Sequence, residues 1–205
     1  FRGDVNQGPA FAFDQLQRRT FNYFWETAHP VTGLVPGRFP TPTFCSIAAV
    51  GFGLTAYGVG VERGWITRDQ AIERTLVTLR FFRNAKQGPE AAGTSGYKGF
   101  YYHFLDMDSG ARFKTNELST VDTTLLMGGV LFAQTYFDKD DPREAEIRQL
   151  ADDLYRAVEW PFAQTRKPWI SMGWTPEDGF IAYDWKGYNE AILVYLLALG
   201  SPTHP

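Results

Sequence analysis

Hydrophobic residues recur at helical spacing in six segments of the chain, and polar or glycine-rich stretches separate these segments. Three of the six have an apolar stripe on one side and polar residues on the other, as helices at a protein surface do. They cover roughly residues 9–27, 67–83 and 141–158. The pattern therefore predicts three amphipathic outer helices.

Two of these helices carry recognisable start signals. Thr67 is followed three residues later by Gln70, which is the spacing of a capping box. Asp141 precedes Pro142, a residue type favoured at the first helical position, and Glu144 stands where it would complete a second box. The sequence therefore predicts helix starts just after Thr67 and Asp141.

The other three segments are apolar almost all round, which is typical of helices buried on most sides. They are residues 45–61, 118–137 and 189–200. Their glycines lower helix stability but let neighbouring helices approach closely; they lie at positions 51, 53, 58, 60, 128 and 129. Because outer and inner segments alternate along the chain, the pattern predicts an all-α fold of concentric layers, an α/α toroid.

The connections differ in length by direction. The links from inner to outer helices are short, whereas the three links from outer to inner helices are long and rich in aromatic residues. The long links are residues 28–44, 87–117 and 161–188. Long loops in a compact domain are usually functional. We expect a β-hairpin in the middle loop, from 99–105 to 111–115, and short strands in the third, all on one rim at the N-termini of the inner helices.

Composition narrows the function. The 205 residues suit one domain or two small ones, and the net charge of −3 gives no basic patch for nucleic acid or anionic lipid. The single cysteine, Cys45, excludes an intramolecular disulfide and a zinc site built from several cysteines. No apolar run reaches the length of a membrane span. The chain starts at Phe1, so we expect a processed or trimmed product whose export signal has been removed.

Glu190 is the first candidate for chemistry, because it is a lone carboxylate at the start of an apolar segment. The predicted helix would place it on the first turn, facing the toroid axis, with Trp174, Trp185 and Tyr188 near its approach. An apolar setting raises a carboxyl pKa, as a general acid requires, whereas a helix N-terminus lowers it. A favourable interaction with the helix dipole would explain the residue equally well.

Two further carboxylates precede or begin the second inner helix. Asp122 follows Ser119 by three residues, so it either completes a capping box or binds substrate. Glu117 is either a solvated loop residue or a second substrate-binding group.

Six aromatic residues of the long loops could stack on sugar rings or simply pack the loops. They are Tyr101, Tyr102, Trp169, Trp174, Trp185 and Tyr188. Three of the six tryptophans lie in the loop that precedes Glu190, and this favours a carbohydrate ligand. His103, in the predicted hairpin, is either a buried hydrogen-bonding residue or a ligand-binding one.

Other chemistries find little support. Residues 106–117 match a calcium loop at positions 1, 3 and 12, but Ala111 stands where that loop requires glycine, so we interpret the stretch as a turn. The sequence has no phosphate-binding glycine loop and no G-x-S-x-G nucleophile elbow. We therefore expect paired-carboxylate chemistry with no metal and no cofactor.

Several motifs together resemble the glycoamylase-like family of glycoside hydrolases, which includes bacterial endo-β-1,2-glucanases and a domain of cyclic β-1,2-glucan synthases. The resemblance runs from about residue 15 to residue 205 and is carried by GVERGWITRDQAIERTLVTLRFF, GFYYHFLDMDSGAR, NELSTVDTTLLMGGVLFAQTYF, SMGWTPEDGF and WKGYNEAILVYLLALGSPTHP. The last motif is highly specific. The resemblance implies an (α/α)6 toroid acting on a glucan with inversion of the anomeric centre.

The resemblance also implies that the chain is incomplete as a domain. An (α/α)6 toroid needs about twelve helices, and the sequence predicts six. We therefore expect residues 1–205 to be the N-terminal half of a catalytic domain, with the other half supplied by a second chain or by a cleaved or omitted segment. The glucan substrate implies a secreted or periplasmic protein.

By the same resemblance, Glu190 in G-Y-N-E-A holds the position of the catalytic acid. Asp122 is the best local candidate for the base or for a sugar-hydroxyl binder, and the resemblance places the base in the other half. The expected substrate-binding residues are Glu117, His103, Tyr102, Trp174, Trp185, Tyr188 and Asn189.

Two other functions stay open on the residues alone. A non-catalytic glycan-binding or assembly subunit would keep the aromatic rim but need no acid. Another α/α-toroid chemistry, such as prenyl transfer or cyclisation, needs a metal or diphosphate site, and the sequence shows neither aspartate-rich helices nor Cys/His ligands for one.

Overall fold

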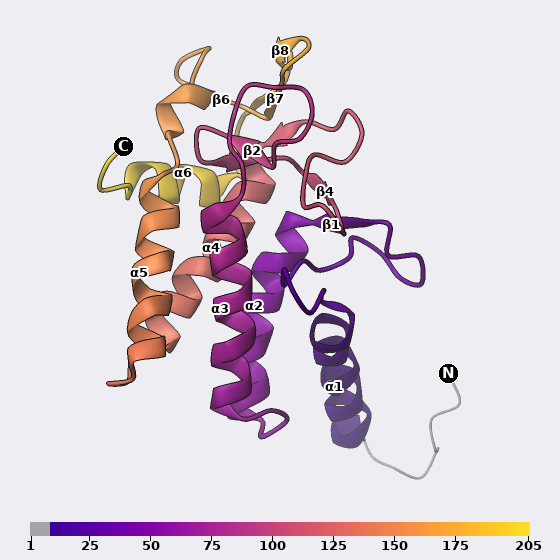
Figure 1. Ribbon diagram of the computed structural model, residues 1–205. Helices are drawn as coiled ribbons and strands as arrows, with labels where there is room; N and C mark the ends of the chain where they lie inside the picture. The colour runs from indigo at the N-terminus through magenta and orange to yellow at the C-terminus, as the bar shows by residue number, and fades with distance from the viewer. Residues whose placement is uncertain (1–8) are drawn as a thin grey trace.

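The computed structural model describes residues 9–205, and within them the predicted helices are confirmed to within a few residues. The helices are α1 (Pro9–Thr27), α2 (Ile47–Glu62), α3 (Arg68–Asn84), α4 (Thr120–Tyr136), α5 (Pro142–Arg156) and α6 (Ile192–Leu199), with a 3-10 turn at Trp160–Ala163. They are arranged as helical hairpins with loops gathered at one end (Figure 1).

The first five helices form the two expected layers. α2 and α4 pack closely against each other, and α3 and α5 lie side by side against them (Figure 1). α1 packs on α2. The alternation of outer and inner helices is therefore confirmed for this part of the chain, which is a partial all-α toroid.

The last helix differs from its prediction. α6 is short, packs on α4, and runs across the direction of α4 and α5 instead of along it (Figure 1). Val194 is its buried residue, while Leu196 is 58% and Leu199 78% exposed. On α2, Phe52 and Val59 are likewise exposed. The prediction that these segments are buried on most sides is therefore confirmed for α2, most of whose residues are buried, and wrong for α6, because no described element covers its exposed face.

One of the two predicted capping boxes is present, and the other is not. The Thr67 hydroxyl accepts the Gln70 N–H at 3.2 Å and the Gln70 side chain accepts the Thr67 N–H at 2.8 Å, which confirms that capping box. Asp141 caps α5 through the Arg143 N–H. Glu144 does not complete a box, because its buried carboxylate pairs with Arg68 at 2.7 Å.

Glycine sets the contact between the two inner helices, as predicted. A Cβ atom on Gly51 would collide with the backbone of Leu125 and Leu126, and one on Gly129 would collide with the backbone of Gly51. The helices therefore touch backbone to backbone at this crossing, which glycine alone permits. Gly128, one residue away, faces open space.

Short strands join the long loops to each other. They are β1 (Phe44–Ser46), β2 (Gly96–Tyr97), β3 (Phe100–Tyr101), β4 (Phe104–Asp106), β5 (Leu118–Ser119), β6 (Ile170–Ser171), β7 (Gly173–Thr175), β8 (Gly179–Phe180) and β9 (Asp184–Trp185). The pairs are β1 with β4, β2 with β3, β5 with β7, β7 with β8 and β6 with β9, all antiparallel. The short strands predicted in the third loop are confirmed.

The predicted hairpin of the middle loop is only partly right. The chain turns back after β4, so that the Phe113 N–H donates to the Phe104 carbonyl at 3.0 Å, but the regular partner of β4 is β1. The Asp106 carboxylate accepts the backbone N–H groups of Asp108 and Ser109. The stretch rejected as a calcium loop is therefore a turn closed by its own aspartate.

All of these strands lie at the end of the molecule where α2 and α4 begin, and the short links 63–67 and 137–141 lie at the opposite end (Figure 1). The predicted rim is thus present. Among the described residues, none of the helices combines the length and apolarity needed to cross a membrane.

The glycine contact makes a direct prediction about stability. Gly129→Ala should lower the free energy of unfolding by about 1–3 kcal/mol, because the added methyl group overpacks the α2–α4 crossing. Urea unfolding of the purified protein measures this. The matched control is Gly128→Ala, which should raise stability by about 0.5–1 kcal/mol because its methyl group meets open space. Equal effects of the two substitutions would contradict the assignment.

Candidate active site

Three of the predicted site residues meet at the rim. His103 lies between β3 and β4, Glu117 directly before β5, and Asp122 on the first turn of α4. The His103 Nδ1 atom is 2.8 Å from Glu117 Oε1, and its Nε2 atom is 3.5 Å from Asp122 Oδ1. We call these three residues the rim cluster.

Backbone pairing places His103 against Glu117. The His103 N–H donates to the Glu117 carbonyl at 2.9 Å. The side-chain amide of Asn116 bonds both backbone groups of Phe104, accepting its N–H at 2.9 Å and donating to its carbonyl at 3.0 Å. The imidazole ring also stacks on the Phe104 ring, with centroids 3.8 Å apart. The histidine is therefore held on both its backbone and its ring face.

Asp122 is held by the cap of its own helix. The Ser119 hydroxyl accepts the Asp122 N–H at 3.2 Å and donates to Asp122 Oδ2 at 2.5 Å. Ser119 is thus the N-cap, as predicted, but the aspartate meets its hydroxyl and not its backbone N–H. The remaining carboxylate oxygen faces His103. The two interpretations of Asp122, capping and site residue, both apply.

The charges of the rim cluster stabilise one another. Partial burial on its own would lower the pKa of His103, but the hydrogen bond to Glu117 and the charge of Asp122 outweigh burial, and the pKa lies above its ordinary value. For Glu117, burial favours a higher pKa, yet the hydrogen bond from His103 holds it below its ordinary value. The arrangement therefore favours an imidazolium between two carboxylates.

The rim cluster is accessible to a ligand. The side chains of His103 and Glu117 are 29% and 33% exposed, and that of Asp122 is 13% exposed. Carboxylates are strong hydrogen-bond acceptors, and sugar hydroxyls are donors that match them. The geometry suits binding and orienting a hydroxyl-rich molecule.

The third loop reaches this site through the start of α4. The Thr120 hydroxyl donates to the Ser171 carbonyl at 2.9 Å and accepts the Trp185 indole N–H at 3.0 Å. β5 pairs with β7, which sets Trp174 opposite Leu118. Trp174 and Trp185 therefore lie on the same rim as the cluster, as predicted, and both are half-buried.

Much of the aromatic content packs the loops. Trp174 contacts the rings of Tyr97 and Phe162, with centroids 5.3 Å and 6.1 Å apart. Tyr101 is buried, and its hydroxyl donates to the Phe82 carbonyl. For these residues the packing interpretation holds.

Tyr102 requires a correction. Its side chain has no exposed surface, and the guanidinium of Arg112 lies 4.8 Å from its ring centroid. A ring covered in this way cannot contact substrate, so its expected place in a sugar subsite is wrong.

Glu190 also differs from its expected position. It lies in an exposed turn before α6, which begins only at Ile192, because the Asn189 side chain accepts the Ala191 N–H at 3.0 Å and holds the turn. Among the described residues its carboxylate has no hydrogen-bond or ion-pair partner. It is therefore not a buried first-turn carboxylate in this chain. Beside it, Tyr188 is 93% exposed and offers a free ring face.

The structure reveals one pair that the sequence analysis missed. The Arg112 side chain is only 1% exposed, and its two terminal nitrogens bond the two oxygens of Glu177 at 2.7 Å and 3.0 Å. The partners are 65 residues apart, so no local pattern connects them. A buried arginine in a loop gives no sequence signal of its own.

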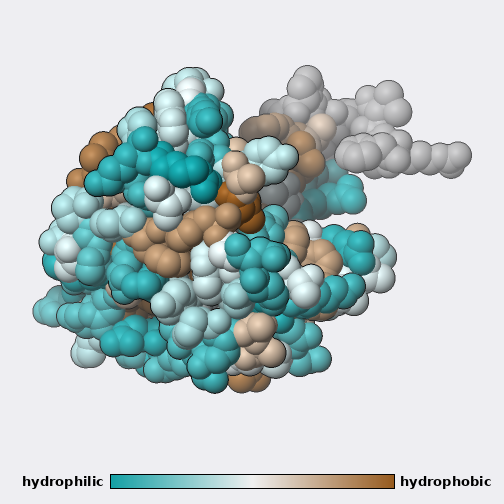
Figure 2. Space-filling model, turned by 90° about the horizontal axis from the view of Figure 1, so that it is seen from above, coloured by the Kyte–Doolittle hydropathy of each residue, from teal (hydrophilic) through white to brown (hydrophobic). Residues whose placement is uncertain are grey.

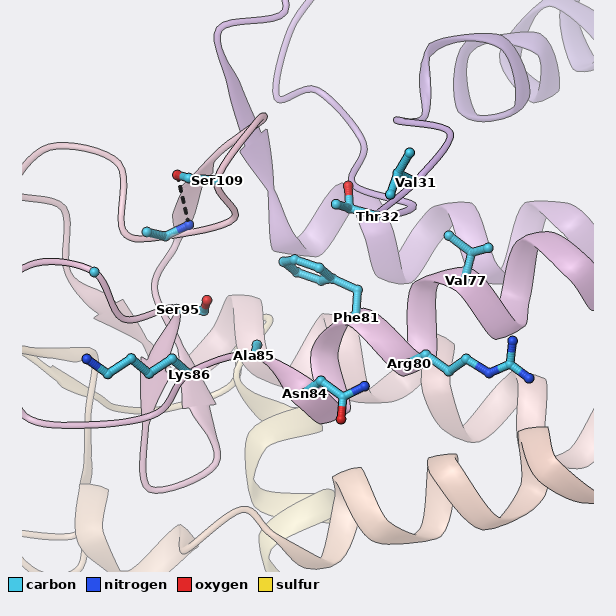
Figure 3. Close-up of a pocket in the computed structure, with 12 residues that line it drawn as sticks. Val31, Thr32, Val77, Arg80, Phe81, Asn84, Ala85, Lys86, Ser95 and Ser109 are labelled. Atoms are coloured by element: carbon cyan, nitrogen blue, oxygen red, sulfur yellow. Dashed lines mark hydrogen bonds between the residues drawn. The ribbon is translucent and has the colours of Figure 1, made fainter.

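A cleft of about 490 Å³ lies elsewhere, between residues 31–32, the end of α3 and the outer side of the middle loop. Phe81 projects into its centre, with Ser95 and Ser109 on one side and Thr32 on another (Figure 3). None of the predicted site residues lines it. Seen from the rim end, the molecule shows a band of hydrophobic surface between hydrophilic areas (Figure 2). The rim cluster thus belongs to an open surface and not to this cleft.

The His103–Glu117 pair predicts pH-dependent stability. Because the His103 pKa is raised, its contribution is fully present below pH 6.5 and is lost as the pH rises through the higher folded-state pKa. Because the Glu117 pKa is lowered, its contribution is present above pH 4.5 and is lost as the pH falls through the folded-state pKa. His103→Gln should therefore reduce the free energy of unfolding more at about pH 5.5 than at about pH 9.

Urea titrations of the native protein and the variant at both pH values test this prediction. His204→Gln is the control, since no carboxylate of the described residues contacts that ring. A loss of the same size for His103→Gln at both pH values would show that charge does not hold the pair.

Comparison with known proteins shows which proteins share this fold. No family model matches the sequence. The chain is 31% identical over 203 residues to the exo β-1,2-glucooligosaccharide sophorohydrolase (non-reducing end) of Parabacteroides distasonis, covering 93% of this chain and 26% of that protein.

Solved structures agree over almost the whole chain. An endo-β-1,2-glucanase from Chitinophaga pinensis, in complex with sophorotriose and glucose, matches with a TM-score of 0.85 and 28% identity over 97% of this chain and 48% of that one. A Bacteroides uniformis protein provisionally classed as a glucoamylase matches with a TM-score of 0.86 and 31% identity over 98% of this chain and 49% of that one. The chain thus spans about half the length of these solved relatives. These likenesses agree with the resemblance of the chain's motifs to the glycoamylase-like family.

Proposed function

We propose that this chain is part of a glycoside hydrolase that acts on β-1,2-linked glucan or its oligosaccharides. The observation that carries the proposal is its likeness, over 97% of its length, to an endo-β-1,2-glucanase solved with sophorotriose and glucose. The rim cluster supports it, because two carboxylates and an imidazole lie accessible on one surface and match the hydroxyl groups of a glucan.

Glu190 is the proposed general acid. Its side chain is exposed and free of partners among the described residues, so it is available to protonate a glycosidic oxygen. In an inverting mechanism a water molecule attacks the opposite face of the sugar, activated by a second carboxylate about 6.5–9.5 Å away. We assign that base to the part of the domain beyond this chain.

Asp122 and Glu117 have the proposed role of orienting the sugar. In each residue one carboxylate oxygen faces His103, and this leaves acceptor positions for hydroxyl groups. One oxygen of Asp122 already accepts the Ser119 hydroxyl, and the other faces His103. Binding and orientation therefore fit this carboxylate better than proton transfer.

The rest of the toroid is the proposed partner. We propose that residues 1–205 are the N-terminal half of the domain and that further helices, from the same polypeptide or a second chain, cover its open sides. The solved relatives are about twice as long, and the apolar sides of this chain are exposed. A groove of about 360 Å³ between α1 and α2, lined by Phe13, Leu16 and Val59, offers one such docking surface. A polymeric glucan substrate suits the secreted or periplasmic location that we propose.

One observation favours a second function. Glu190 makes no contact with the rim cluster, whereas the cluster is fully formed within this chain. A non-catalytic glycan-binding or assembly subunit would show the same features. The two functions differ in what happens when the proposed acid is removed.

Glu190→Gln tests the proposed acid. In the complete polypeptide that carries this chain, it should lower the rate of β-1,2-glucan hydrolysis by about 10²–10⁴-fold, because the amide cannot donate the required proton. Product sizing after incubation with β-1,2-glucan, β-1,3-glucan, starch and sophorose measures both rate and linkage. The melting temperature should stay the same, since the carboxylate has no partner to lose.

Glu26→Gln, an exposed glutamate on α1, is the matched control and should retain full activity. Unchanged hydrolysis by the Glu190 variant would remove this residue from the role. Binding of β-1,2-glucan by a protein that hydrolyses none of the four substrates would establish the second function.

The proposed partner predicts how the chain behaves alone. Residues 1–205, expressed without further sequence, should associate and bind a hydrophobic dye, because exposed apolar faces of this kind are rare in soluble monomers. Light scattering and dye fluorescence measure both properties, and Leu196→Glu together with Phe52→Glu should reduce both. A stable monomer that binds no dye would contradict the proposed docking.

A further inference from the structure

The Arg112 side chain donates hydrogen bonds to three residues, Ala91, Asn116 and Glu177. Its Nε atom donates to the Asn116 carbonyl at 2.7 Å, and one terminal nitrogen donates to the Ala91 carbonyl at 3.3 Å. The two terminal nitrogens also donate hydrogen bonds to the two oxygens of the Glu177 carboxylate. The Arg112 side chain is only 1% exposed, whereas that of Glu177 is 41% exposed.

These bonds connect three separated segments around Glu117. Asn116, whose carbonyl Arg112 holds, directly precedes Glu117. Glu177 lies in the turn between β7 and β8, and β7 runs beside β5, which directly follows Glu117. Gly173 of β7 is so close that a Cβ atom placed there would lie 3.0 Å from the Glu117 Cγ atom. Glu117 therefore lies between the backbone segment that Arg112 bonds and strand β7, which leads to Glu177.

We propose that Arg112 and Glu177 are positioning residues that hold the Glu117 carboxylate against His103. They act on the rim cluster through the backbone and need not touch the ligand. The consequence for glucan binding rests on the proposed function, whereas the positioning of Glu117 does not.

The residue types support positioning over simple stability. An ion pair is weak evidence for stability, whether it is exposed or buried. An arginine provides a planar fork that bonds a carboxylate bidentately and stacks on an aromatic ring, and Arg112 does both, with Glu177 and Tyr102. Lysine keeps the charge but lacks this fixed geometry.

The protonation of His103 reports on the position of Glu117 without any assay of activity. The charged groups that face His103 are Glu117 and Asp122, and Arg112 acts on Glu117. In a proton NMR titration, His103→Gln assigns the imidazole signal of interest.

Arg112→Lys in the complete polypeptide is the decisive variant, because it preserves every charge and removes only the fork. The His103 pKa should fall toward its ordinary value of about 6.5 as Glu117 moves away. Glu177→Gln should shift it in the same direction. An unchanged His103 titration in both folded variants would overturn the proposal.

A second bidentate pair in the same chain is the matched control. Arg80 and Glu146 join α3 to α5 with bonds of 2.6 Å and 2.7 Å, away from the rim cluster. Arg80→Lys and Glu146→Gln should leave the His103 titration unchanged. A shift of equal size in these controls would show a general loss of structure and would also overturn the proposal.

Hydrolysis kinetics separate this inference from the proposed function. On β-1,2-glucan, Arg112→Lys should raise KM several-fold and leave kcat nearly unchanged, since a ground-state contact is weakened. A native protein with no hydrolysis would contradict the proposed function, yet the His103 titration would still decide the positioning role.

Discussion

The contact between Gly51 and Gly129 is the constraint on which the rest of the structure depends. Because neither residue has a side chain, α2 and α4 meet backbone to backbone, and their first turns come to the same end of the molecule. β1 and β5 lead directly into these helices, through the caps Ser46 and Ser119. The strands of the rim are thus placed by the helix crossing beneath them.

The rim cluster follows from that placement. β1 pairs with β4 on one side of His103, and the backbone of Glu117 accepts the His103 N–H on the other, so the histidine is fixed between the starts of the two inner helices. Asp122, one turn into α4, then faces its free ring nitrogen. Two carboxylates 5 positions apart in sequence share one imidazole because a capped helix start and a short strand meet there.

The sequence predicted the parts that are local. Helical periodicity and the Thr67 cap are encoded within a few residues, so α1 to α5 were placed correctly. The pairing of β1 with β4 joins segments about 60 residues apart, and neither segment carries a sequence pattern that predicts its partner. Glu190 was misplaced because the apolar run after it does not show that the helix begins only at Ile192, after a turn held by the Asn189 side chain. Burial of Tyr102 likewise depends on Arg112, a residue that no periodic pattern marks.

The ion pairs of the rim and the exposed apolar side chains lie in different parts of the chain. The ion pairs that shape the rim, from Arg112 to His103, are complete within the chain, whereas large apolar side chains of α2 and α6 are left facing outward. Glu190 precedes α6, and among the described residues its carboxylate has no partner. Under the proposed function, recognition of sugar hydroxyls would need only the rim cluster, which this chain contains. Under the same proposal, the geometry of proton transfer would depend on the element that covers α6, because that element would set the surroundings of Glu190.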